Sequence, residues 1–225
     1  MTPEPVAPAA PAADETKQFL DALFAGKSDA EFILIWLLKG KRSAWFANIQ
    51  AAADYVQQHS AQDVYVGVAV SAADHGPYVR LKIEGNERMP SSIIALWADL
   101  DIAGEGHKET SSKHKHYAPN EAAARSIMFS EFPPTLLVHS GGGLQAWWLF
   151  RELWTLESEE EVRKASALAT RWLGALRARA QASGWTIDGV ADLTRVLRVP
   201  STANCKVPGN PRPVRLLEEI GRAHV

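Results

Sequence analysis

The pattern of apolar and polar positions along the chain predicts a mixture of strands and helices. Runs of apolar and β-branched residues bounded by turn residues predict strands over 32–38, 63–71, 78–83, 93–102, 135–139 and 144–150. Apolar residues at helical spacing predict helices over 15–24, 49–58 and 120–129. The longest helix follows the capping box Ser158-x-x-Glu161 and stops at Gly184. Because the elements do not follow a strict βαβ order, the pattern favours the α+β fold class.

Both ends of the chain differ from its middle in composition. Residues 1–14 are rich in Pro and Ala and carry almost no bulky apolar side chain, so they predict a disordered tail. Residues 219–225 look like the translation of a common sequencing adapter, which predicts that the natural chain continues beyond residue 218. Residues 15–218 are then expected to form one domain of ordinary size.

Composition indicates where the protein is expected to be found, but it says little about its function. The chain has no run of 18 apolar residues and no secretory leader, so we expect a soluble, cytoplasmic protein without a membrane partner. The single cysteine, Cys205, excludes an internal disulfide and an all-cysteine zinc site. The formal net charge of −2 leaves any nucleic-acid binding to a local basic patch. The basic turn 39–42 beside Trp45 is a candidate, although a solvated turn is the plainer interpretation.

Two aspartates share one face of the predicted strand 93–102. Successive strand residues point to opposite sides, so Leu96, Ala98 and Leu100 lie on one face and Asp99 and Asp101 on the other. Two carboxylates roughly 7 Å apart repel each other unless a cation holds both. A divalent ion such as Mg²⁺ typically binds one or two carboxylates together with substrate phosphates. The alternative is a frayed strand end that faces solvent.

A glycine-rich turn joins the next two predicted strands. Its residues are Ser140, Gly141, Gly142 and Gly143. Backbone N–H groups without side-chain cover can approach a polyphosphate closely, so the turn is a candidate triphosphate cradle. Gln145 follows it and could reach a phosphate or a sugar. A plain hairpin turn is the alternative.

The segment 187–206 concentrates charged and polar side chains. Arg195 and Arg198 follow Asp188 and Asp192, and arginine suits phosphate because its planar fork donates paired hydrogen bonds. A surface ion pair between Asp192 and Arg195 is the alternative. The loop after Pro200 adds further donors, which are Ser201, Thr202, Asn204 and Lys206.

These three segments, in this order, resemble the archaeo-eukaryotic primase superfamily, especially the primase-polymerase domains of phages and plasmids. Asp99-Leu100-Asp101 is similar to the family's D-x-D strand, and Ser140–Gln145 to its S-G-x-G-x-H turn. Residues 187–206 are similar to a hydrophobic-Asp step followed by R-x-x-R-x-P-G-T-x-N-x-K. The likeness covers about residues 31–216. Gln145 stands where many members have a phosphate-contacting histidine, and Ser201 replaces a glycine.

The resemblance implies a fold, a reaction and a set of ligands. The fold would be a primase-polymerase catalytic core with a mostly antiparallel sheet flanked by helices. The reaction would be template-dependent nucleotidyl transfer in phage or plasmid DNA replication, on a single-stranded DNA template with NTPs or dNTPs. A helicase domain in cis, beyond residue 218, is a further expected partner.

The resemblance also distributes roles among the residues. Asp99, Asp101 and a third acid would hold Mg²⁺ or Mn²⁺, and Asp188 is favoured over Asp192 as that third acid. The remaining residues would hold the triphosphate, namely Ser140, Gly141, Gly142, Gly143, Gln145, Arg195, Arg198, Asn204 and Lys206.

Three other functions compete with this interpretation. A D-x-D glycosyltransferase would use the same acids, but it would not explain the arginines and would require a nucleotide-binding α/β half before them. A nicking domain is suggested by His114-Lys115-His116 with Tyr117, yet the residue between such histidines is normally apolar. A non-catalytic nucleic-acid-binding replication module is the third.

Overall fold

A computed structural model describes residues 13–83, 89–104, 116–128, 132–187 and 191–219. Within these ranges the helices are α1 (Ala13–Phe24), α2 (Ile49–Gln58), α3 (Glu121–Met128), α4 (Glu159–Ala182) and the short 3₁₀ helix η1 (Lys39–Lys41). The longer strands are β1 (Phe32–Leu37), β2 (Arg42–Phe46), β3 (Val64–Ser71), β4 (Ser92–Asp101), β5 (Leu136–His139) and β6 (Gly143–Thr155). Shorter strands follow, namely β7 (Val196–Arg198), β8 (Ala203–Asn204), β9 (Arg212–Pro213) and β10 (Arg215–Glu219).

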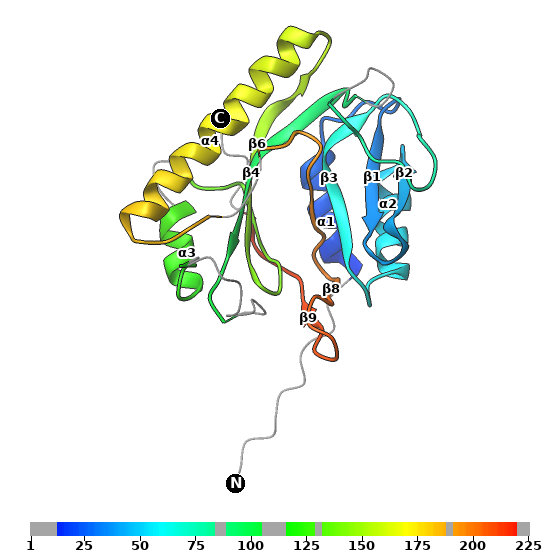
Figure 1. The fold of residues 1–225 in the computed structure, drawn as a ribbon. Coiled ribbons are helices and arrows are strands. Elements are labelled where there is room, and N and C mark those ends of the chain that lie inside the picture. Colours follow the sequence, from blue (N-terminus) through cyan, green and yellow to red (C-terminus); the bar gives the residue numbers. More distant parts are fainter. Residues whose placement is uncertain (1–12, 84–88, 105–115, 129–131, 188–190, 220–225) are drawn as a thin grey trace.

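One antiparallel sheet organises the domain, with strand order β10-β5-β6-β4-β3-β1-β2. The named pairing of β3 with β4 covers only Ala69–Ile93 and Val70–Ser92, and the two strands then separate. Strand β7 pairs with β3 in the space that opens (Figure 1). The sheet therefore has an acid-bearing part (β10, β5, β6, β4) and a hairpin part (β7, β3, β1, β2). This architecture confirms the predicted α+β fold with a mostly antiparallel sheet.

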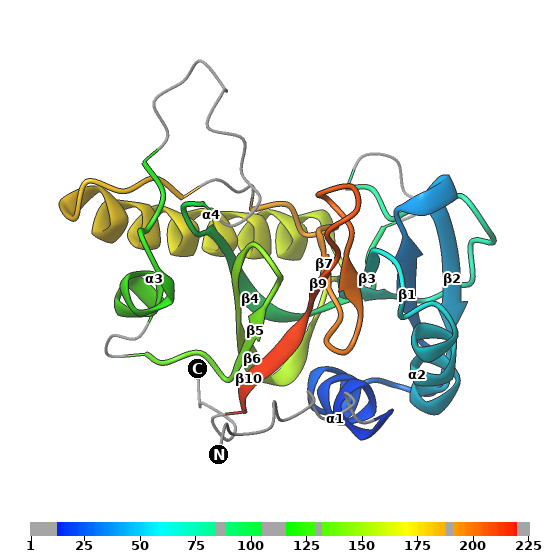
Figure 2. The same cartoon turned by 90° about the horizontal axis from the view of Figure 1, so that it is seen from below.

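The helices cover opposite faces of this sheet (Figures 1 and 2). Trp148 packs edge-on against Trp172 of α4, with ring centroids 4.8 Å apart. On the other face, Trp147 meets Phe19 of α1 edge-on at 5.9 Å. Because side chains alternate along β6, two neighbouring tryptophans anchor two different helices. Both are fully buried, and each contributes about 2–3 kcal/mol or more of apolar burial.

The predicted helix termini match the local chemistry. The Ser158 hydroxyl accepts from the Glu161 N–H at 3.2 Å and starts α4. Asn48 caps α2 in the same way, through the Ala51 N–H at 3.0 Å. Gly184 adopts φ +76 just after α4, where a left-handed residue ends a helix. None of the described helices combines the length and apolar character needed to cross a bilayer.

The predicted strand over 78–83 is wrong. These residues form turns and irregular backbone, and Tyr78 has φ +68, which a strand cannot accommodate. Tertiary bonds decide the conformation here: Trp45 Nε1 donates to Gly76 O at 3.1 Å, and Arg80 Nη2 to Thr194 O at 3.0 Å. The short strands β2 and β7–β10 had no clear apolar alternation and were not predicted.

The boundaries at the chain ends shift slightly. Helix α1 starts at Ala13, two residues inside the predicted tail, while residues 1–12 lie outside the described ranges. Glu15 fastens this helix, because its carboxylate accepts from Ser201 Oγ and from the Leu216 N–H at 3.1 Å. Glu219 is still part of β10 and pairs with Leu136, whereas residues 220–225 lie outside the described ranges.

Candidate active site

Strand β4 places the two predicted acids beside the opening between the two parts of the sheet. Asp99 lies opposite Gln145 of β6, and Asp101 lies opposite Gly143. Their neighbours Ala98 and Leu100 are buried in the core, so the strand alternates as the sequence predicts. Asp99 and Asp101 keep partial contact with solvent.

Burial and mutual repulsion make this acid pair unusual. The pKa of Asp99 rises from the usual 3.8 to about 6, first because protein surrounds the carboxylate and second because Asp101 is close. Arg195, the Gln145 amide and Arg198 oppose this rise. A bound cation would relieve both causes. The residues present therefore fit a divalent ion, which takes carboxylate oxygens.

The third acid is not fixed by the described residues. They contain no group of three potential His, Cys, Asp or Glu metal ligands. Asp188, the favoured third acid, lies outside the described ranges. Asp192 is exposed, and its Oδ1 accepts from the Thr194 N–H at 3.0 Å and the Thr194 hydroxyl at 2.8 Å. Asp192 is also not among the described charges that shift the pKa of Asp99.

Gln145 connects the acid-bearing part to the hairpin part of the sheet. Its side chain is 4% exposed, and its Nε2 lies 3.4 Å from Asp99 Oδ1. Its Oε1 accepts from the Arg198 N–H of β7 at 2.9 Å. Both ends of the amide are thus engaged within the protein. Gln145, which was predicted to contact phosphate, instead connects Asp99 to the backbone of Arg198 and so orients the Asp99 carboxylate.

The glycine turn is packed against the protein. A Cβ on Gly143 would lie 2.0 Å from Leu100 O of the neighbouring strand, so only glycine fits there. Gly141 has φ +79, and its N–H donates to His139 Nδ1 at 3.1 Å. The N–H and the hydroxyl of Ser140 both donate to Gly143 O. The N–H groups of Ser140 and Gly141 therefore already have partners within the protein. This differs from the prediction that the turn leaves its N–H groups uncovered for a triphosphate.

Asn204 and Lys206 belong to the loop that packs on this turn. Asn204 is buried, and its Nδ2 donates to Ser140 O at 2.8 Å. Its Oδ1 accepts from the Lys206 N–H at 3.0 Å, which closes a local turn. Arg212 Nη1 donates to Gly141 O at 3.2 Å. The second and third sequence motifs are thereby joined through hydrogen bonds.

Arg198 is held in a buried ion pair that the sequence analysis missed. Its Nη1 lies 2.5 Å from Asp63 Oδ1, and both side chains are about one-tenth exposed. The same Asp63 oxygen accepts from the Cys205 N–H at 3.1 Å. The guanidinium lies over the Tyr65 ring, 4.8 Å from its centroid. Burial, the largest cause, raises the pKa of Tyr65.

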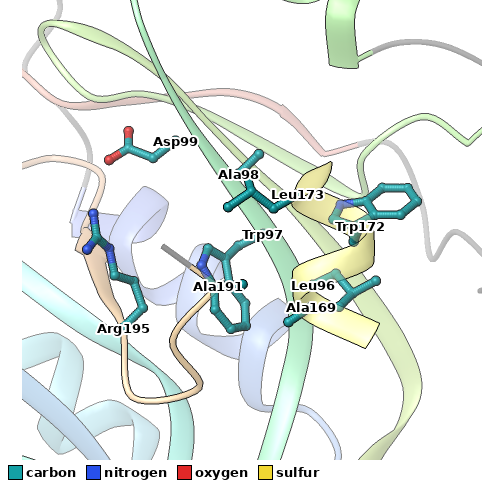
Figure 3. A pocket seen from close by; sticks show the side chains of 9 residues that line it. All are labelled: Leu96, Trp97, Ala98, Asp99, Ala169, Trp172, Leu173, Ala191 and Arg195. Carbon is teal, nitrogen blue, oxygen red and sulfur yellow. The ribbon is translucent and has the colours of Figure 1, made fainter. Parts of the chain in front are cut away.

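Arg195 is the cation that faces the acids. Its side chain extends toward Asp99 from the loop before β7 (Figure 3), and its charge lowers the pKa of Asp99. Among the described residues, its guanidinium makes no hydrogen bond or ion pair, so the alternative of a surface pair with Asp192 is not what forms. A cavity of about 10 Å³ between Arg195, Trp97 and Leu173 has room for a single water molecule. A nucleotide would have to bind outside it.

Arg80 is a second cation that sequence reasoning did not identify. It is half-buried, its guanidinium lies 5.1 Å from the Trp36 ring centroid, and burial, as the largest cause, lowers its pKa. The charges of Asp192 and Arg195 act on it. In the sequence, the signal for this cation was Arg80 itself. It was overlooked because residues 78–83 were interpreted as a strand.

The fold of the chain, with its acid-bearing strand β4, is similar to that of a solved primase-polymerase domain. The chain is similar to the primase-polymerase domain of cyanophage S-2L, with a TM-score of 0.55 and 12% identity over 96% of this chain and 95% of that one. Primase RepB′ is also similar, with a TM-score of 0.48 and 14% identity over 93% of this chain and 58% of that one. No protein-family model and no curated protein matches the chain. At these identities the likeness concerns the fold.

Proposed function

We propose that the chain is a template-dependent nucleotidyltransferase that starts or extends nucleic-acid strands in a phage- or plasmid-type replication system. The observation that carries the proposal is the like-charged pair Asp99–Asp101 on β4, with the Asp99 pKa raised to about 6, in a fold of the primase-polymerase type. Like charges held close together in a partly buried site cost stability, so the pair is expected to serve a ligand.

Asp99 and Asp101, with Asp188 as the proposed third acid, would hold one or two Mg²⁺ or Mn²⁺ ions. Such ions supply positive charge that lowers the pKa of an attacking 3′-hydroxyl and neutralises a leaving pyrophosphate. A bound cation would favour the ionised form of Asp99 and so oppose the rise of its pKa. Gln145 keeps its carboxylate oriented, because the same amide is fixed by the Arg198 N–H.

Arg195 is the best-placed side chain to hold the triphosphate. It faces Asp99, and its planar fork can donate paired hydrogen bonds to phosphate oxygens. Arg80 adds positive charge beside it. The 3′-hydroxyl would attack the α-phosphorus and release its proton to water, the bond from the α-phosphorus to the oxygen that bridges it to the β-phosphate would break, and pyrophosphate would leave with its charge balanced by these groups. Arg198 supports this arrangement from the buried pair with Asp63.

The fold separates this proposal from one of its rivals. A D-x-D glycosyltransferase would require a nucleotide-binding α/β half before the acids, whereas every strand pairing of the described main sheet is antiparallel. The nicking motif lies only partly within the described residues, because His114 and Lys115 are outside them while His116 and Tyr117 are inside. The non-catalytic module differs from the proposed enzyme in activity alone.

Primer-free synthesis tests the proposed function directly. The protein is incubated with a single-stranded DNA template, labelled NTPs in one arm or dNTPs in another, and Mn²⁺. We expect labelled oligonucleotides from the wild type in at least one arm and none from Asp99→Asn. Absence of product in both arms, with and without a supplied primer, would support the non-catalytic module instead.

A further inference from the structure

A basic groove lies on the hairpin part of the sheet, outside the acid site. It has a volume of about 550 Å³ and is bounded by η1, the start of β2 and the C-terminal end of α2. Lys39, Arg42 and His59 line it, together with Gln58, Gln62 and Tyr78. None of the described lining residues is acidic. We infer that this groove binds the backbone and one base of single-stranded DNA, with Tyr78 as the stacking residue.

Tyr78 has the properties of a ligand-binding residue rather than a core residue. Its side chain is 70% exposed, the most exposed of the large apolar and aromatic side chains in the described chain. Its backbone has φ +68, a left-handed conformation that costs a non-glycine residue about 1–2 kcal/mol. Strain of this kind persists where the surroundings enforce it, and it concentrates at functional sites.

Two hydrogen bonds, one on each side of Tyr78, hold its loop in place. On one side, the buried Trp45 donates to Gly76 O at 3.1 Å and meets His75 edge-on at 5.1 Å. On the other side, Arg80 donates to Thr194 O at 3.0 Å. The aromatic residue next to the basic turn in sequence, Trp45, is thus a support for the loop. Tyr78 is the ring available for a base.

Charge and stacking together identify the ligand. Single-stranded nucleic acid binds where cations track the phosphates and an aromatic face receives a base. Lys39 and Arg42 supply the cations and Tyr78 the ring, while Gln58 and Gln62 add neutral donors and acceptors. A partner protein with an apolar surface would find little to cover in this groove, since Leu37 is buried.

The loop that carries Tyr78 also leads toward the acids. Arg80 bonds to Thr194, whose neighbour Arg195 faces Asp99. Through Arg80 and Thr194, the loop of Tyr78 is connected to the arginine that faces Asp99, so we assign the bound strand as the template. This identification of the strand as the template rests on the proposed function, whereas the binding of single-stranded DNA does not.

The first test removes the ring without straining the fold. Tyr78→Gly should weaken the Kd for a fluorescein-labelled oligo-dT by roughly 5- to 150-fold, the loss expected for one stacked base. Its melting temperature should equal or exceed that of the wild type, because glycine tolerates φ +68. Tyr78→Phe keeps the ring and should bind as the wild type does. Phe132→Ala, which truncates another exposed aromatic at 52% exposure, should also leave the affinity unchanged.

The second test removes the charges. The double variant Lys39→Ala/Arg42→Ala should reduce the slope of log K against log salt by about 1.4, roughly 0.7 for each phosphate that the protein no longer neutralises. The matched control is Arg163→Ala/Lys164→Ala, on the exposed surface of α4, which should keep the wild-type slope.

The two proposals fail in different ways. Wild-type affinity and salt slope in both Tyr78→Gly and Lys39→Ala/Arg42→Ala would overturn the groove, even if the enzyme synthesises oligonucleotides. A wild type that binds oligo-dT through Tyr78 but makes no product would overturn the enzyme and leave the groove in place. If both hold, Tyr78→Gly should raise the template concentration that gives half-maximal incorporation.

Discussion

Two charged pairs lie within one connected region of the sheet, and they are built in opposite ways. Asp63 and Arg198 have opposite charges, are almost fully buried and are further satisfied by the Cys205 N–H and the Tyr65 ring. Asp99 and Asp101 have like charges and keep contact with solvent, and the charge of Asp101 contributes to the raised pKa of Asp99.

The difference separates a pair that serves the fold from a pair that serves a ligand. Opposite charges with complete hydrogen bonding need nothing from outside the protein. Like charges in a partly buried site remain costly until a cation arrives. Gln145 connects the two charged pairs, because one end of its amide contacts Asp99 and the other end contacts the Arg198 backbone.

Neutralising an acid should have the largest effect on activity. Asp99→Asn should lower nucleotide incorporation by at least about 1,000-fold, because a lost metal ligand removes several kcal/mol of transition-state stabilisation. The asparagine can still accept from Gln145, so the fold and oligo-dT binding should persist. Asp54→Asn, on the exposed surface of α2, is the matched control. Incorporation within a few-fold of the wild type would remove Asp99 from the metal site.

The same variant should gain stability with a defined pH dependence. In the wild type the folded pKa of Asp99 is raised to about 6, so its folded state retains a proton that the unfolded state releases above about pH 4. The wild type therefore loses stability through this group between about pH 4 and pH 6, by roughly 3 kcal/mol at most. Without metal, Asp99→Asn should match the wild type at pH 4 and exceed it at pH 7 in urea unfolding. An equal difference at both pH values would contradict the shifted pKa.

Breaking the opposite-charge pair should have the reverse effect on stability. Asp63→Asn leaves the Arg198 guanidinium buried without its counter-ion, which should cost about 3–5 kcal/mol of unfolding free energy. The apolar double variant Asp63→Leu/Arg198→Met should recover part of this loss, because no charge remains buried. Urea denaturation of the three proteins measures the difference. A loss below about 1 kcal/mol in Asp63→Asn would show that the pair behaves as a surface pair.

The contrast between the pairs also shows what sequence could predict. The shared face of Asp99 and Asp101 follows from strand alternation, a local rule, and the structure has the predicted strand. The partner of Arg198 is Asp63, 135 positions away, and no local pattern connects them. The fold class follows likewise from element order, while the conformation of Tyr78 depends on bonds from Trp45 and Arg80. Predictions therefore held where short-range geometry decides and failed where distant partners do.

Arg195 offers a smaller and more selective effect. Arg195→Lys keeps the charge but loses the planar fork, so the apparent nucleotide affinity should fall by roughly 10-fold while oligo-dT affinity stays constant. Arg171→Lys, on the exposed side of α4, is the control. Isothermal titration with a non-hydrolysable nucleotide and Mn²⁺ measures the nucleotide affinity of both variants. Unchanged nucleotide affinity in Arg195→Lys would mean that this arginine only balances the charge of Asp99.

The smallest effect is expected for Asp192, and it identifies the third acid. Asp192 is exposed and occupied by two bonds from Thr194, which an asparagine oxygen can also accept. Asp192→Asn should therefore change the incorporation rate by less than about two-fold and the unfolding free energy by less than about 0.5 kcal/mol. Asp188→Asn, in contrast, should reduce incorporation as strongly as Asp99→Asn does, if Asp188 is the third acid. Should Asp192→Asn abolish incorporation and Asp188→Asn leave it intact, the turn at Asp192 must open to deliver its carboxylate to the metal, and the roles of the two residues are exchanged.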